Sequence, residues 1–133
     1  MQNTPISNSE KFQFNNLLDR SVLDEVYGGD LEYAGEIFEM VLTYSVEELK
    51  ALDTAIQTDD WVSASRIAHK LKPNLSMVGL TELEEKMYQI EKEAETNPQM
   101  IPQLFAEITS ELEIYFPIIE KDLEKIKNLT KLV

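Results

Sequence analysis

The chain has 133 residues, of which 43% are hydrophobic and 28% are charged, which fits one domain of ordinary core size. Twelve lysines and arginines stand against 25 acidic residues, giving a formal net charge of -13. This balance argues against general nucleic-acid binding, which depends on cations that displace phosphate counterions. The absence of cysteine excludes disulfides, thiolate zinc sites and cysteine nucleophiles, and favours the reducing cytoplasm.

Other classes of site are excluded by missing residue types. The four glycines do not assemble into a phosphate-binding loop, and His69 has no second histidine with which to hold zinc. No apolar run reaches the roughly 18 residues of a membrane helix, and the start of the chain has no signal-peptide pattern. We therefore expect a cytoplasmic chain that does not enter the membrane and binds no cofactor of its own.

The N-terminal part of the sequence divides into an arm and a first helix. Residues 1–11 have little apolar content and no sustained period, which predicts a mobile arm ahead of a helical bundle over residues 12–133. We expect a short helix within residues 12–27, ended by the glycine pair that begins at Gly28.

The next two helices follow from caps and apolar spacing. Asp30 can cap a helix whose apolar residues recur at steps of three and four as far as Ile56. Asp60 and its neighbours place negative charge before a further helix over residues 61–78, which Gly79 is expected to end.

The C-terminal part of the sequence predicts two more helices. Thr81 and Glu84 form a capping-box pattern at the start of one, and Asn97 with Pro98 opens the other as cap and first-turn proline. No segment shows the alternation of a strand. Four long amphipathic helices with short connections predict an all-α, antiparallel up-and-down four-helix bundle with an additional short N-terminal helix.

The helix over residues 61–78 carries the chemistry. On a helical wheel His69 lies about 150° from the core direction, so we expect its side chain to face solvent. Arg66 and Lys72 lie three residues before and after it and are its neighbours on that face, whereas Lys70 points away.

The surroundings of His69 are basic in sequence. No acidic residue occurs in the 21 positions 61–81, where the chain average predicts about four. Neutral imidazole is a nitrogen nucleophile, and the nearby cations are expected to disfavour its protonation and to pair with an attached phosphoryl group. A solvated basic face around an incidental histidine is the alternative.

A known family shares this pattern. The run Ala68-His69-Lys70-Leu71-Lys72, followed by Gly79 ten residues after the histidine, resembles the motif of the histidine phosphotransfer (HPt) domain. The turn Gly28-Gly29-Asp30 is similar to the start of the second helix in that family. The resemblance covers residues 20–95 in order and spacing.

The resemblance implies a phosphoryl carrier of a two-component phosphorelay rather than an enzyme. His69 would accept phosphate from the aspartate of one response-regulator receiver domain, free or in a hybrid histidine kinase, and pass it to another. Lys72 would support the phosphate, with Arg66 beside it, and the receiver would bring the Mg²⁺. One departure is Pro73, which stands where the family usually has glycine and predicts a local kink.

The receiver is expected to dock on the small and apolar residues around the histidine. These candidate docking residues are Val62, Ser65, Pro73, Ser76 and Gly79. Because the apolar stripes are used in the core, we expect a monomer. The alternative function is a non-catalytic helical interaction module that binds a partner through the same face, with His69 incidental.

Overall fold

A computed structural model describes residues 12–130, and the predicted mobile arm of residues 1–11 lies outside this range. Within the described range there are helices and no strand, as predicted. The elements are α2 (Arg20–Tyr27), α3 (Leu31–Gln57), α4 (Trp61–Met77), α5 (Thr81–Thr96), the 3-10 turn η1 (Pro98–Met100) and α6 (Ile101–Thr130).

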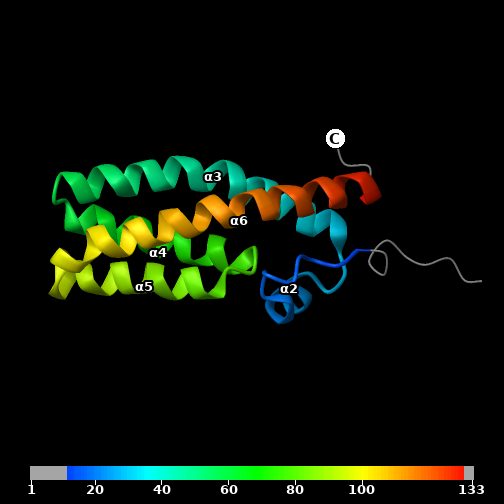
Figure 1. The fold of residues 1–133 in the computed structure, drawn as a ribbon, viewed down its shortest axis with the longest axis horizontal. Coiled ribbons are helices and arrows are strands. Elements are labelled where there is room, and N and C mark those ends of the chain that lie inside the picture. The colour runs from blue at the N-terminus through cyan, green and yellow to red at the C-terminus, as the bar shows by residue number, and fades with distance from the viewer. Residues whose placement is uncertain (1–11, 131–133) are drawn as a thin grey trace, which may run out of the picture.

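The four long helices form a closed bundle. Helix α4 packs between α3 and α5, and α6 closes the bundle against α5 and α3. Short connections reverse the chain between successive helices, so neighbours run antiparallel, and α2 lies at the end where α4 turns into α5 (Figure 1). The predicted fold class is therefore confirmed. None of the helices between residues 12 and 130 has the length and apolar character needed to cross a bilayer.

Three aspartates start helices in the same way. In each case the aspartate carboxylate accepts a hydrogen bond from the backbone N–H three residues later, which satisfies one of the free amides of the first turn. The pairs are Asp19 with Val22, Asp30 with Tyr33 and Asp60 with Ser63. The predicted caps at Asp30 and Asp60 are confirmed.

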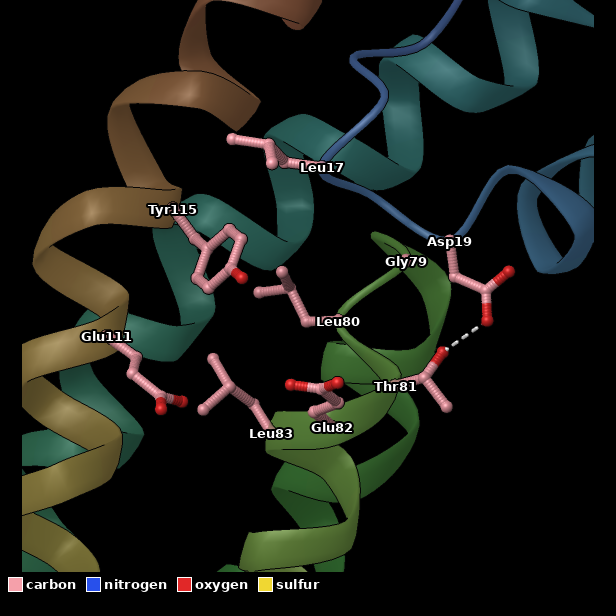
Figure 2. A pocket seen from close by; sticks show the side chains of 9 residues that line it. All are labelled: Leu17, Asp19, Gly79, Leu80, Thr81, Glu82, Leu83, Glu111 and Tyr115. Atoms are coloured by element: carbon pink, nitrogen blue, oxygen red, sulfur yellow. Dashed lines mark hydrogen bonds between the residues drawn. The ribbon is translucent and has the colours of Figure 1, made fainter.

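The start of α5 differs from the prediction. Leu80 is the N-cap and makes no side-chain capping bond, and Thr81 is already the first helical residue. Figure 2 shows why: the Thr81 hydroxyl turns to the N-terminal segment and donates to Asp19 Oδ2 at 2.8 Å. The predicted capping box with Glu84 is therefore wrong. The last long helix also begins later than predicted, since Pro98 opens the 3-10 turn and α6 starts at Ile101.

The turn between α4 and α5 is held by the segment around α2. Gly79 has a positive φ of 76° and ends α4 as predicted, one residue beyond Val78. The Asp19 N–H donates to the Gly79 carbonyl at 2.8 Å, and the Tyr27 hydroxyl donates to the Met77 carbonyl at 2.6 Å. These bonds fix the point at which the chain reverses.

The segment before α2 is anchored in the core. Phe14 packs against Phe38 of α3, with ring centroids 5.6 Å apart. Nearby, the backbone N–H of Asn15 donates to the carboxylate of Asp122, which is only 2% exposed on α6. Burial raises the pKa of Asp122, and the hydrogen bond from Asn15 opposes that rise. The N-terminal segment is thus part of the folded domain from Phe12 onward.

Gly79 provides a test of how tightly this turn is packed. A Cβ on Gly79 would lie 2.9 Å from the Asp19 backbone nitrogen, whereas a Cβ on Gly28 would meet nothing within 4 Å. Both glycines have positive φ. We expect Gly28→Ala to lower the free energy of unfolding by about 1 kcal/mol and Gly79→Ala by about 2 kcal/mol more. Urea denaturation measures both, and equal losses would contradict the close packing at Gly79.

Candidate functional site

His69 lies in the middle of α4 and points away from the core. Its side chain is 67% exposed, whereas Ala68 and Leu71, on the opposite face of the helix, are buried. The outward orientation expected from the helical period is therefore present in the structure. Helix α4 continues through Pro73 to Met77, and Pro73 has no N–H with which to bond the His69 carbonyl.

The neighbouring helix places a carboxylate against this histidine. Glu91 of α5 lies with Oε1 2.8 Å from His69 Nδ1 and with Oε2 2.6 Å from Lys72 Nζ. The Ser65 hydroxyl donates to the Glu91 backbone carbonyl at 3.3 Å. Three successive turns of α4 therefore contact one residue of α5, which fixes the position of the carboxylate.

The charge of Glu91 determines which ring nitrogen of His69 is free. Burial alone would raise the pKa of Glu91, but the hydrogen bonds from Lys72 and His69 outweigh it and lower that pKa. An ionised carboxylate only accepts hydrogen bonds, so Nδ1 of His69 must carry the proton that it shares with Oε1. In the neutral ring the lone pair then lies on Nε2, which makes Nε2 the nucleophile.

Contacts within the unphosphorylated protein hold the Lys72 side chain in place. Its side chain is 21% exposed, and its Nζ lies 4.8 Å from the ring centroid of Tyr88 as well as against Glu91. Lys92 contacts the same ring, with Nζ 5.3 Å from the centroid. A carboxylate and an aromatic ring thus keep the ammonium next to the histidine.

The basic stretch of α4 is less positive in space than in sequence. Lys72 is paired with Glu91, and Lys70 turns to α3, where it lies 3.9 Å from Glu48. Arg66 is exposed and makes no ion pair with any residue in the described part of the chain. The acids that α4 lacks are therefore supplied by the neighbouring helices, which pair with two of the three cations of this stretch.

The predicted docking residues separate into three groups by exposure. Val62, which is 71% exposed, and Pro73 lie open on the surface of α4 that carries His69. Ser65 and Ser76 are half-buried, and Ser65 is bonded to α5. Gly79 is buried beneath Leu18 and Asp19. The prediction that it lies on the docking surface is therefore wrong, and its role is to form the turn between α4 and α5.

Two site residues were missed by sequence reasoning, Glu91 and Tyr88. Helix α5 is rich in glutamate, so nothing in its composition distinguishes Glu91. A geometric signal exists, however: His69 and Glu91 are each eleven residues from Leu80, and Lys72 and Tyr88 are each eight residues from it. In two antiparallel helices that reverse at Leu80, such pairs lie opposite one another.

Comparison with protein families identifies a match. The family model of the Hpt domain matches residues 36–129, which is more than half of the chain and includes His69, Lys72 and Glu91. No curated protein and no solved structure matches the chain.

The contacts of Glu91 predict a pH-dependent contribution to stability. Because folding lowers its pKa, the contribution is complete above the ordinary value of 4.5 and is lost as the pH falls through the lower value of the folded state. We expect Glu91→Gln to cost about 0.5 to 1 kcal/mol of unfolding free energy at neutral pH and almost nothing in acid.

Urea denaturation of wild type and variant at both pH values measures this difference. Glu85→Gln, which removes the same charge from an exposed position of α5, is the control and should change stability by less than about 0.5 kcal/mol. An equal cost of Glu91→Gln at neutral and acid pH would contradict the ionised state of Glu91.

Proposed function

The chain belongs to the Hpt-domain family, and on that premise we propose that His69 is the phosphoacceptor of a two-component phosphorelay. It would take a phosphoryl group from the aspartyl phosphate of one receiver domain and pass it to the aspartate of another. The observation that supports this most is the exposed imidazole whose Nδ1 is occupied by Glu91 at 2.8 Å, which leaves Nε2 for the reaction.

The transfer would proceed by attack of Nε2 on phosphorus. The lone pair of Nε2 forms the new N–P bond, and the electrons of the breaking P–O bond return to the aspartate carboxylate of the receiver. Nδ1 keeps its proton, and the positive charge that develops on the ring lies beside Glu91. Stabilising charge and orienting the nucleophile are the main contributions that a protein makes to phosphoryl transfer.

Two cations would support the phosphoryl group. Lys72 is close to His69 but paired with Glu91, so an incoming dianion would compete with the carboxylate for the ammonium. Arg66 is exposed on the same face and is the cation most available to the partner. Mg²⁺ would come with the receiver domain, so this chain would act as a phosphocarrier that binds no cofactor.

The receiver would dock on the part of α4 that lies open. Val62 and Pro73 flank His69 there, and Ser76 extends the same face. A hollow between α4 and α5, lined by Trp61, Val62 and Ala94 among others, adjoins the histidine. A monomer in the cytoplasm would suffice for this role, with a receiver domain or a hybrid histidine kinase as partner.

The second candidate function is a non-catalytic interaction module. The same exposed face could bind a partner with no chemistry at His69. The hydrogen bond that Glu91 accepts, which selects one ring nitrogen, favours the phosphocarrier, because an interaction module has no need of a defined tautomer.

Direct phosphoryl transfer tests the proposal. Incubation with phosphorylated receiver domains of the same organism should place acid-labile phosphate on the wild-type chain and none on His69→Gln. Mass spectrometry under neutral conditions measures the product. Failure of every receiver to phosphorylate the folded wild-type chain would contradict the proposed function.

Lys72 distinguishes the two candidate functions. We expect Lys72→Ala to slow transfer about two- to fivefold, the factor expected for an ion pair of limited burial, with a smaller change in receiver affinity. Lys70→Ala is the matched control, since Lys70 turns away to α3. Rapid-quench kinetics and binding titrations measure the two quantities. An effect of Lys72→Ala on binding alone would favour the interaction module.

A further inference from the structure

The position of Glu91 also affects His69 after it has been phosphorylated. Its side chain is 23% exposed, its Oε2 pairs with Lys72, and its backbone carbonyl accepts a hydrogen bond from Ser65. It contacts the ring at Nδ1, while the phosphoryl group would be attached at Nε2, on the other side of the ring. Phosphorylation at Nε2 therefore leaves the contact with Glu91 in place.

The proton on Nδ1 decides how readily phosphate leaves. When Nδ1 is protonated, cleavage of the Nε2–P bond returns its electron pair to a ring that departs as neutral imidazole. When Nδ1 is unprotonated, the same cleavage must release imidazolate, which is a much poorer leaving group. A group that keeps the proton on Nδ1 therefore accelerates release, as general acids do for other leaving groups.

Charged groups of α4 and α5 face the phosphorylated ring. On the side of the ring, α4 contributes Arg66 and Lys72, and α5 contributes Glu91 and Glu95. On the other side of α4, Lys70 turns away to Glu48 of α3, and α2 packs at the far end of α4. Lys70 and Lys72 are paired with Glu48 and Glu91. Of all these groups, the Glu91 carboxylate makes the hydrogen bond to the ring.

We propose that Glu91 is a positioning residue that retains the Nδ1 proton of phosphorylated His69 and so keeps its phosphate ready for transfer. This inference rests on the proposed function of His69. The N–P bond breaks, its electron pair returns to Nε2, and the acceptor oxygen, from aspartate or water, forms the new P–O bond while Nδ1 keeps its proton. The chain would then pass phosphate on rather than store it.

Chemical phosphorylation allows a test without any receiver. Phosphoramidate transfers its phosphoryl group to histidine with loss of ammonia, and His69 is the single histidine of the chain. The variant Glu91→Gln keeps an oxygen acceptor of the same shape and removes the charge. The lifetime of the phosphorylated full chain is then measured from about pH 5 to about pH 9 for wild type, Glu91→Gln and the control Glu85→Gln.

The expected result is a lifetime that depends on both pH and Glu91. In acid all three proteins should lose phosphate at similar rates, because every ring is protonated. At mildly alkaline pH, Glu91→Gln should hold phosphate about three- to tenfold longer, because the neutral amide holds the Nδ1 proton less strongly than the carboxylate does. Glu85→Gln should follow wild type at every pH.

Two other results would overturn the inference. Identical pH profiles for wild type and Glu91→Gln would show that the carboxylate does not hold the proton. A lifetime changed by the same factor at every pH would assign the effect to release of Lys72, since a lysine keeps its charge over this range. Either result leaves the receiver-dependent test of the proposed function unaffected, so the two failures are distinguishable.

Discussion

The carboxylate of Glu91 organises both basic groups of the site, and the chemistry argued for His69 depends on it. One oxygen accepts a hydrogen bond from Nδ1 of the histidine and the other forms an ion pair with the ammonium of Lys72. Without this residue nothing in the described part of the chain would fix the proton of the exposed ring on Nδ1. With it, Nδ1 is hydrogen-bonded within the protein and Nε2 is free to react with a partner.

That contact requires the correct register between α4 and α5, which is set at the turn. Gly79 adopts a conformation that suits glycine, and the backbone N–H of Asp19 donates to its carbonyl. Thr81 and Tyr27 add a bond on either side of the turn. A shift of one residue in α5 would rotate Glu91 by about 100° around its helix and remove it from the histidine. The α2 segment therefore supports the site although it lies at the end of the bundle.

Local patterns were sufficient to predict most of the fold. Asp30 and Asp60 mark the starts of α3 and α4, and Gly28 and Gly79 mark the ends of α2 and α4. The outward position of His69 follows from the period of one helix. The capping box at Thr81 failed because a residue distant in sequence, Asp19, offers the hydroxyl a better partner. The residues near Thr81 in sequence do not indicate that a distant carboxylate will accept its hydroxyl proton.

The composition of the site was harder to predict for the same reason. A stretch of α4 without acids suggested a positive surface, but Glu48 and Glu91 reach it from the neighbouring helices. Gly79 was expected on the docking surface as one of the small residues around the histidine, yet the segment around Leu18 and Asp19 covers it. Each of these outcomes depends on contacts between helices, which the spacing within one helix does not encode.

The tautomer of His69 can be observed directly by ¹⁵N NMR of the imidazole ring. Because the chain has a single histidine, the spectrum contains one pair of ring nitrogens and needs no separation from others. At a pH where the ring is neutral, Nδ1 should carry the proton and Nε2 should show the shift of an unprotonated nitrogen. A neutral ring with its proton on Nε2 would contradict the role assigned to Glu91 and the choice of nucleophile that follows from it.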